Sequence, residues 1–162
     1  MAIEIERKFL VKGNGWRNQA VGQVYRQGYM STEDGITLRA RVAGDKGYLT
    51  IKGPSFGNSR AEYEYEIPVE DAQEMLNSLC GSPLIEKVRY KVYHGEFIWE
   101  VDEFAGENQG LIVAEVELND ENQKVELPDW IGEEVSHDKR YSNSNLSKNP
   151  WKNWSKQFKI IN

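Results

Sequence analysis

The sequence has one cysteine, Cys80, and two histidines, His94 and His137, among its 162 residues. A single cysteine excludes an intramolecular disulfide and a cysteine-based zinc site, and a lone thiol is typical of a reducing compartment. Neither histidine stands in an HExxH motif or in a spacing typical of a Ser-His-Asp triad. We therefore expect a cytoplasmic protein in which neither residue type carries the chemistry.

Long apolar runs and a surplus of basic residues are also missing. No apolar run approaches the roughly 20 residues of a membrane span, and the first residues are charged, unlike a secretory signal. Acidic residues outnumber basic ones, 26 to 20, which gives a net charge of −6. General nucleic-acid binders carry a basic footprint. Neither a membrane nor a nucleic acid is therefore expected as a partner.

The composition, with 39% hydrophobic and 28% charged residues, is that of an ordinary globular protein. A chain of this length can bury a core without metal or disulfide staples. No linker, low-complexity tract or tandem repeat divides it. We expect a single domain over residues 1–162, and the sequence does not indicate its oligomeric state.

What the sequence does contain is a repeated strand pattern. Two kinds of side chain alternate in eight segments, which glycine-rich turns separate. These segments are 2–12, 22–31, 35–43, 47–53, 60–68, 83–93, 96–104 and 111–118. Eight antiparallel strands joined by short turns predict a mainly β fold, a closed barrel or a strongly curved sheet, and an even count would let an up-and-down barrel close.

Helical spacing is confined to two places. Residues 70–80 put Ala72, Met75, Leu76 and Leu79 on one face, which predicts a helix packed against the sheet. After residue 118 the strand pattern weakens. The tail, residues 149–160, could form a short amphipathic helix with Trp151, Trp154 and Phe158 on its apolar side.

Charged side chains recur with a period of two on one face of nearly every expected strand. Residues two apart in a strand share a face, so each strand contributes a row. The rows are Glu4, Glu6 and Lys8; Gln27 and Tyr29; Arg39 and Arg41; Thr50 and Lys52; Glu62, Glu64 and Glu66; Lys87, Arg89 and Lys91; Glu100 and Asp102; Glu115 and Glu117. Most other aromatic strand residues, Tyr25, Tyr48, Tyr63, Tyr65, Tyr90 and Trp99, are expected on the apolar face.

Such a face can meet solvent, as in any half-buried sheet, or it can line the lumen of a barrel. Its signs are sorted by strand, with acidic pairs on some and basic pairs on others, which an ordinary solvent face does not require. A charged lumen is costly unless its ions are paired or ligated. Walls of both signs suit a polyphosphate bound together with divalent cations, since lysine and arginine bind phosphate oxygens and carboxylates bind the metal.

The order of these segments resembles the CYTH family, the triphosphate tunnel metalloenzymes, whose signature is ExExK near the N-terminus. The likeness covers roughly residues 1–151, and the chain is most similar to the short, stand-alone bacterial members. It includes EIERKFLV, RQGY, TLRAR, LTIKG, SRAEYEYEIP, LIEKVRY, WEVDEF, GLIVAEVEL and RYSNSNL. The resemblance implies an eight-stranded antiparallel barrel that forms a charged tunnel, with a few helices packed outside.

The resemblance also implies a role for each charged row. Metal ligands for Mg²⁺ or Mn²⁺ would be Glu4, Glu6, Asp102, Glu115 and Glu117, with Glu62, Glu64 and Glu100 as secondary candidates. The triphosphate would be held by Arg39, Arg41, Lys52, Lys87, Arg89 and Arg140. Lys8 and Tyr29 would orient or activate the attacking water, with Lys8 acting either as a base or only as a charge.

The function predicted in this way is a metal-dependent triphosphatase that converts inorganic triphosphate, a small molecule, to pyrophosphate and orthophosphate. Alternatives within the family are a class IV-type adenylate cyclase and a thiamine triphosphatase, but the sequence reveals no pocket for adenine or thiamine. A barrel that binds polyphosphate or nucleotide without catalysis is the non-enzymatic alternative. Formation of cyclic AMP from ATP, or binding without turnover, would separate these possibilities.

Overall fold

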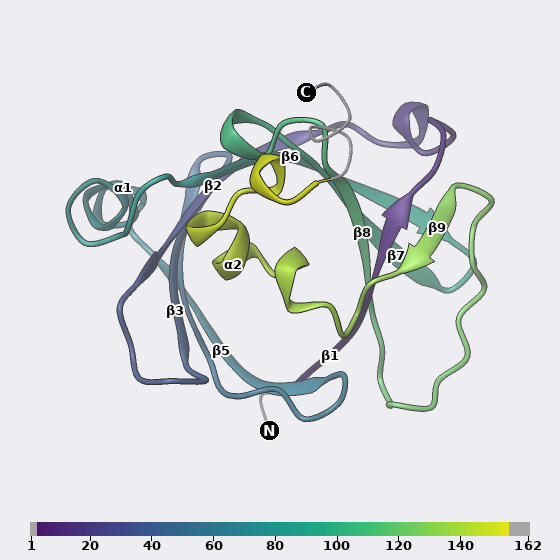
Figure 1. Cartoon of the computed structure of the whole chain (residues 1–162), viewed down its shortest axis with the longest axis horizontal. Coiled ribbons are helices and arrows are strands. Elements are labelled where there is room, and N and C mark those ends of the chain that lie inside the picture. Colours follow the sequence, from purple (N-terminus) through teal and green to yellow (C-terminus); the bar gives the residue numbers. More distant parts are fainter. Residues whose placement is uncertain (1–2, 156–162) are drawn as a thin grey trace.

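The alternating segments form an antiparallel sheet in the computed structural model, which describes residues 3–155. Within these residues there are nine strands, and every strand pairing is antiparallel. They are β1 (Ile3–Val11), β2 (Gln23–Met30), β3 (Thr37–Ala43), β4 (Lys46–Lys52), β5 (Ser59–Ile67), β6 (Ile85–His94), β7 (Phe97–Phe104), β8 (Ile112–Glu117) and β9 (Ile131–Glu134). Figure 1 shows the first eight strands as a ring, viewed through its open centre.

The first eight strands close into a barrel, which confirms the predicted fold class. Their order is β5-β4-β3-β2-β6-β7-β8-β1, and the pairing of β1 with β5 completes the ring. This order departs from a simple up-and-down barrel, because β1 lies between β8 and β5, and β2 pairs with β6. Two longer connections make this possible: the loop after β1, with the 3₁₀ helix η1 (Arg17–Gln19), and the helix between β5 and β6.

Strand β9 lies outside the barrel and was not expected from the sequence. It pairs with the second half of β1, where β5 no longer does. Arg7 faces outward from β1, and its guanidinium lies 2.8 Å from the carboxylate of Glu134 on β9.

Helix α1 (Val69–Ser78) packs on the outside of β3 and β4. It begins after Pro68, and the negative charges of Glu70 and Asp71 in its first turn stabilise it by interacting with the positive end of the helix dipole. Ala72 and Leu76 are buried as predicted, whereas Leu79 is 61% exposed, so its expected place in the core is wrong. The helix ends before Leu79, which therefore does not continue the buried stripe.

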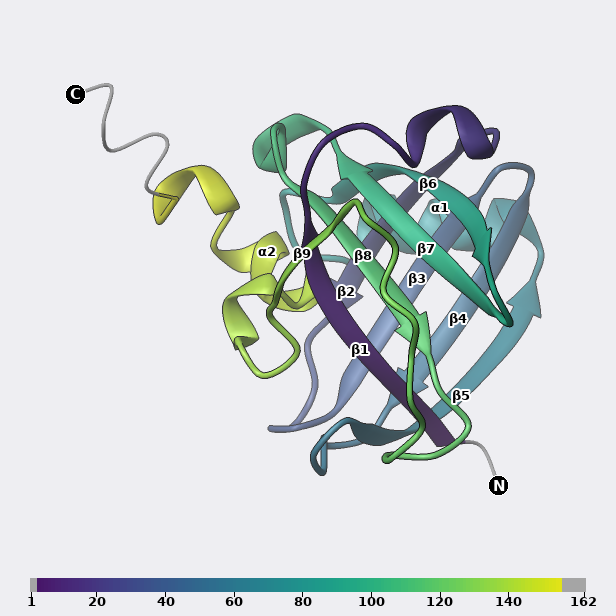
Figure 2. The same cartoon turned by 90° about the vertical axis from the view of Figure 1, so that its right-hand side faces the viewer.

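The C-terminal part of the described chain lies across one end of the barrel (Figures 1 and 2). It contains η3 (Lys139–Tyr141), α2 (Asn143–Lys148) and η4 (Trp151–Asn153), and Leu146 anchors it in a buried apolar cluster. A further 3₁₀ helix, η2 (Gly106–Asn108), precedes β8. The tail helix was expected over residues 149–160, and within the described part of this range the chain forms only η4. Trp151 and Trp154 pack against the cluster, and Phe158 lies outside the described residues.

The largest apolar core lies between the barrel wall and its covering loops, not in the barrel lumen. Phe9, Trp99 and Val116 point outward from β1, β7 and β8, and Trp16 and Trp130 cover them from the loops. Trp99 is fully buried, as predicted, whereas Tyr63 and Tyr65, 46% and 57% exposed on the outside of β5, are not core residues. This placement leaves the lumen free for polar side chains.

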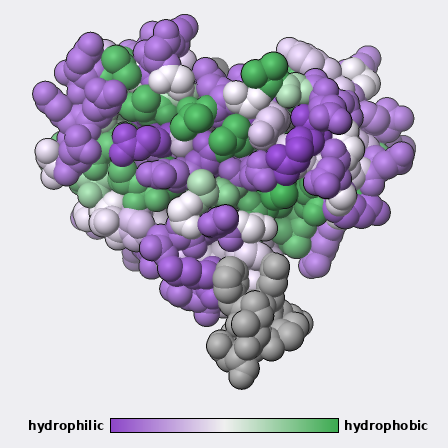
Figure 3. Space-filling model, turned by 90° about the horizontal axis from the view of Figure 1, so that it is seen from above, coloured by the Kyte–Doolittle hydropathy of each residue, from purple (hydrophilic) through white to green (hydrophobic). Residues whose placement is uncertain are grey.

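Seen from above in Figure 3, the outer surface shows apolar patches separated by hydrophilic side chains. No helix within residues 3–155 has the length and apolar character that crossing a membrane requires.

Candidate active site

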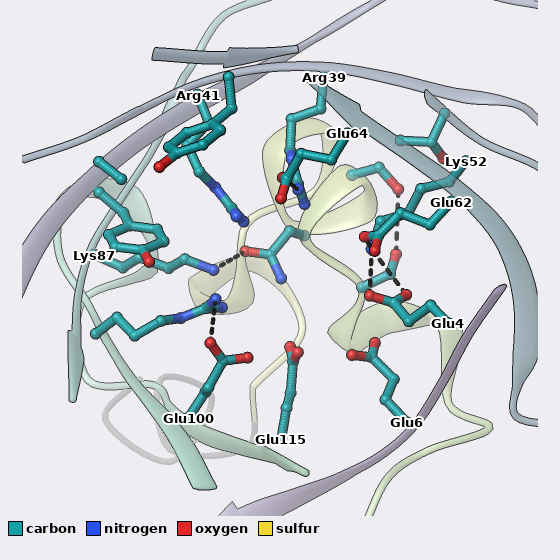
Figure 4. A pocket seen from close by; sticks show the side chains of 18 of the residues that line it. Glu4, Glu6, Arg39, Arg41, Lys52, Glu62, Glu64, Lys87, Glu100 and Glu115 are labelled. Atoms are coloured by element: carbon teal, nitrogen blue, oxygen red, sulfur yellow. Dashed lines mark hydrogen bonds and ion pairs between the residues drawn. The ribbon is translucent and has the colours of Figure 1, made fainter. Parts of the chain in front are cut away.

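A polar cavity of about 500 Å³ occupies the lumen of the barrel. Figure 4 shows its two walls: Arg39, Arg41 and Lys87 gather on one side, and several glutamates gather on the other. All eight barrel strands contribute side chains, because the period of two turns alternate residues of each strand inward. The charged face predicted from the sequence is therefore the lining of the tunnel.

The basic wall consists of side chains from β3 and β6. Arg39, Arg41, Lys87 and Arg89 are all buried. Tyr25 lies between two of them: the carbon at the centre of each guanidinium is 4.9 Å (Arg41) and 4.8 Å (Arg89) from its ring centre. Such contacts stabilise cations against an aromatic face. The expectation that Tyr25 and Tyr48 lie on the apolar face was wrong, since both line the cavity.

Asp102 on β7 anchors the basic wall from behind. Its two carboxylate oxygens lie 2.7 Å from Arg89 Nε and 2.7 Å from Lys87 Nζ. Burial alone would raise the pKa of Asp102, but Arg89 and Lys87 outweigh it and hold the pKa below its usual value. The same carboxylate raises the pKa of Arg89, again against the effect of burial.

Within the part of the chain that the structure describes, the basic wall has four buried cationic side chains and only one buried aspartate, Asp102. Burial, together with Arg39 and Arg89, lowers the pKa of Arg41 to about 10, so Arg41 remains charged at neutral pH. Burial, with Arg89 and Arg41 nearby, lowers the pKa of Lys87 to about 7 in spite of Asp102. The Nε of Arg39 is buried without a hydrogen-bond partner among residues 3–155. An anion with several oxygens would relieve all three conditions.

The acidic wall is centred on β1 and β8. Glu6 and Glu115 lie close enough to share a hydrogen bond, and burial together with Glu115 and Glu4 raises the pKa of Glu6 well above its usual value. Glu115 shows the opposite behaviour. Burial would raise its pKa, but the cations of Lys8, Arg89 and Lys87 lower it strongly. Burial and then Glu4 and Glu100 raise the pKa of Glu117.

Four further glutamates of the lining each have a cationic neighbour. Lys52 Nζ lies 3.0 Å from Glu4 Oε1 and 3.4 Å from Glu62 Oε2, and so connects β4, β1 and β5. Glu64 lies 3.3 Å from Arg39 Nη2, and Glu100 lies 3.2 Å from Arg89 Nη1. Figure 4 shows these side chains pointing into the lumen.

The acidic wall fits a hard divalent cation by its chemistry, because all its donors are carboxylate oxygens and Glu6 is repelled by two like charges. Among residues 3–155, however, no group of three or more histidine, cysteine, aspartate or glutamate side chains is arranged so that it could hold a metal ion by itself. Mg²⁺ is usually bound by one or two carboxylates together with waters and substrate phosphates. The arrangement therefore suits an ion that arrives with its substrate.

Lys8 and Tyr29 both line the cavity. Lys8 Nζ lies 3.6 Å from Glu115 Oε1 and donates a hydrogen bond to the carbonyl oxygen of Tyr141. Burial opposes its charge, but Glu115, Glu6 and Asp102 outweigh burial and raise its pKa. In this arrangement Lys8 is an ammonium ion, which favours a charge role over that of a base.

Two of the predicted site residues lie away from the lining. Asp102 is completely buried behind the basic wall, with Arg89 and Lys87 on its oxygens, and Arg140 lies outside the cavity. Arg140 pairs with Asp138 at 2.7 Å and stacks on Trp154. Metal binding by Asp102 and phosphate binding by Arg140 stay predictions. All the other predicted residues border the cavity.

Three residues that contact the basic wall, Tyr25, Gln27 and Asn143, had no role in the sequence-based prediction. Tyr25 shares the inward face with Gln27 and Tyr29, so its parity in the strand was the available signal. Gln27 is fully buried beside Arg41. Asn143, at the start of α2, accepts a hydrogen bond from Lys87 at 2.9 Å. No sequence signal places Asn143 there, because the contact depends on where the C-terminal segment crosses the barrel end.

Comparison with known proteins agrees with this geometry. The family model described as CYTH domain matches residues 2–149. An inorganic triphosphatase from Acetivibrio thermocellus is 57% identical over 154 residues, covering 95% of this chain and 99% of that protein. An inorganic triphosphatase from Nitrosomonas europaea is 40% identical over 153 residues, covering 89% of this chain and 96% of that protein.

A solved structure supports the same comparison. The crystal structure of an inorganic triphosphatase superposes with a TM-score of 0.65 at 38% sequence identity, and it covers 91% of this chain and 95% of that one. The similarity therefore extends over nearly the full length of each chain and includes the strands that build the cavity.

Proposed function

The chain belongs to the CYTH domain family, and from that premise we propose that it is a triphosphatase that hydrolyses inorganic triphosphate to pyrophosphate and orthophosphate. The observation that carries the proposal is the division of the tunnel into a basic and an acidic wall. One wall suits phosphate oxygens, and the other suits the divalent cation that accompanies a polyphosphate. The 57% identical relative, named for the same activity, supports this substrate.

Within this proposal the basic wall binds and orients the substrate. Arg39, Arg41, Lys87 and Arg89 hold phosphate oxygens, and their positive charges stabilise the charge that spreads over the transferred phosphoryl group. Because Asp102 and Tyr25 hold these side chains in place before binding, little reorganisation is needed when the reaction occurs. Lys8 adds a further positive charge near the acidic wall.

Within the same proposal the acidic wall would hold Mg²⁺ or Mn²⁺. Glu4, Glu6, Glu115 and Glu117 are the proposed ligands, with Asp102 and the nearby Glu62, Glu64 and Glu100 as further candidates. When bound, the ion would neutralise phosphate charge and polarise the phosphoryl oxygens. Lys52 would have to release Glu4 for such binding, which the pairing of Lys52 with Glu62 makes possible.

The test is orthophosphate release from inorganic triphosphate, measured with Mg²⁺, with Mn²⁺ and with excess chelator. ATP and thiamine triphosphate serve as parallel substrates. Release that is fastest with inorganic triphosphate and that disappears with chelator is the expected result. Equal rates with all three substrates would overturn the proposed substrate, and undiminished release in chelator would overturn the role of the metal.

A further inference from the structure

A chain of hydrogen bonds connects the basic wall to Tyr29 through two side chains that have no part in the function proposed above. Gln27 Nε2 lies 2.8 Å from Tyr29 Oη and 3.4 Å from Asn143 Oδ1, and its Oε1 lies 2.9 Å from Arg41 Nε. Asn143 Oδ1 also lies 2.9 Å from Lys87 Nζ. The side chain of Gln27 is completely buried, so these bonds satisfy it without water.

The direction of every bond in this chain is fixed by its two cationic ends. A guanidinium or an ammonium group can donate hydrogen bonds but cannot accept them. Arg41 therefore requires the oxygen of the Gln27 amide, which leaves the Gln27 NH₂ group to face Tyr29 and Asn143. Lys87, in the protonated form that a bound anion favours, likewise requires the oxygen of Asn143, which is the atom that the Gln27 NH₂ group needs as an acceptor. Arg41 and Lys87 therefore require the same orientations of the Gln27 and Asn143 side-chain amides.

This arrangement determines what Tyr29 can do. Its hydroxyl oxygen accepts a hydrogen bond from Gln27, so its single proton must point elsewhere. Within residues 3–155 the Tyr29 hydroxyl donates to no protein group, and Tyr29 lines the cavity. The proton therefore faces the lumen. An ionised phosphate oxygen can only accept a hydrogen bond, and a Tyr29 lone pair in this direction would repel it.

We propose that Gln27, held by Arg41 and Asn143, is a positioning residue that fixes Tyr29 as a hydrogen-bond donor to an oxygen of the bound triphosphate. Tyr29 keeps its proton throughout and is not the base that activates water. This inference rests on the proposed function, since it places a triphosphate at the basic wall. It adds a neutral donor to a wall otherwise made of cations.

Gln27→Glu tests the proposal, because it keeps the size of the side chain and its bond to Arg41 while removing the donor to Tyr29. The carboxylate would accept the tyrosine proton and turn a lone pair toward the substrate. We expect kcat/KM for inorganic triphosphate to fall about 10²-fold, the loss typical of one preorganised donor. Tyr29→Phe removes the same donor and should cost a similar factor.

The double variant Gln27→Glu/Tyr29→Phe separates positioning from the effect of an added charge. If Gln27 acts through the tyrosine proton, Gln27→Glu has little left to remove once Tyr29 is Phe. Adding it to Tyr29→Phe should then lower kcat/KM no more than about twofold, which is the usual error of additivity between independent substitutions. A full second loss in the Tyr29→Phe background would show that the carboxylate acts by its charge, and the proposal would be wrong. Gln23→Glu, on the same face of β2 but exposed at its first residue, measures the general cost of a new charge.

Binding of imidotriphosphate, a non-hydrolysable analogue, distinguishes this proposal from the proposed function. A wild-type protein that binds the analogue but releases no orthophosphate from inorganic triphosphate would contradict the proposed function, and the same set of variants, read by affinity, would still decide the role of Gln27. Failure of the wild type to bind the analogue would overturn both. Thermal melting of each variant establishes that it is folded.

Discussion

Lys87 shows at the residue scale how the basic wall is prepared for an anion. It is buried with Arg89 and Arg41 nearby, and Asp102 pairs with only two of these three cations, Lys87 and Arg89. Its pKa of about 7 means that the ligand-free protein carries less positive charge at pH 8 than its composition implies. A bound polyphosphate favours the charged form of a nearby lysine, so ligand binding and protonation of Lys87 are coupled.

We predict that binding of imidotriphosphate at pH 8 is accompanied by uptake of up to about one proton at Lys87, and that this uptake falls toward zero at pH 6. The sign follows from the pKa: below about 7 the lysine is already protonated before binding. Calorimetry in buffers of different ionisation enthalpy measures the uptake. Lys87→Arg stays charged throughout and is the reference, and a wild type with the same proton balance as this variant would contradict the coupling.

Glu6 shows the complementary condition on the acidic wall. Burial and the like charges of Glu115 and Glu4 raise its pKa, so its ionised form destabilises the metal-free fold. Glu6→Gln should raise the melting temperature in chelator at pH 8 and abolish most of the triphosphatase activity with Mg²⁺. The gain in stability should shrink as the pH falls, because protonated Glu6 no longer repels its neighbours.

The matched control is Glu66→Gln on β5, where the side chain is exposed. It should change neither the melting temperature nor the activity. A Glu6→Gln protein that melts below the wild type in chelator would show that Glu6 is a structural partner and not a repelled ligand.

At the scale of elements, the docking of α2 determines whether Asn143 reaches Lys87. Leu146 is fully buried among Ile85, Phe104 and Leu111, and the side chain of Ser147 donates to the carbonyl of Pro83. We predict that Leu146→Ala lowers the free energy of unfolding by about 2–5 kcal/mol and also lowers kcat/KM. Thermal melting and steady-state kinetics measure the two effects.

Lys148→Ala, on the same helix but exposed, should change neither quantity. Wild-type kinetics in a strongly destabilised Leu146→Ala protein would show that the site does not depend on the docking of α2.

The elements also show how much the sequence could predict. Period-two alternation located all eight barrel strands, because inward and outward positions differ in polarity wherever a wall separates a lumen from a core. Tyr25 and Tyr48 were assigned to the wrong face because their residue type was weighed above their parity. Strand β9 has only four residues, and its place is set by pairing with β1, so no local pattern indicated it.

The position of α2 and the neighbours of each strand were likewise beyond the sequence, since both depend on contacts between residues far apart in the chain. The same limit applies to Asp102. Its spacing put it correctly on the inward face, but only the fold shows that Arg89 and Lys87 already occupy its oxygens.

At the scale of the whole molecule, the barrel closes at a short seam. Only three residue pairs connect β1 with β5 within the described chain, from Ile3–Ala61 to Ile5–Ser59, whereas eight connect β6 with β7. Lys52 strengthens the seam from inside, because it bridges Glu4 on β1 and Glu62 on β5. The seam therefore lies beside the proposed metal ligands.

We predict that backbone amides of residues 59–61 exchange hydrogen faster than those of residues 99–101, because a short ladder opens at lower free energy. Imidotriphosphate with Mg²⁺ should slow exchange at the seam and leave the β6–β7 ladder nearly unchanged. Hydrogen exchange read by mass spectrometry measures both regions. Uniform exchange of the two ladders would argue against a weak seam.

The most direct test of a two-walled tunnel acting on inorganic triphosphate is the identity of its products. Phosphorus-31 NMR of the wild-type protein with inorganic triphosphate and Mg²⁺ should show pyrophosphate and orthophosphate growing together in equal amounts, and neither in the presence of chelator. Substrate that persists unchanged with Mg²⁺, while ATP in the same experiment yields cyclic AMP and pyrophosphate, would contradict the account.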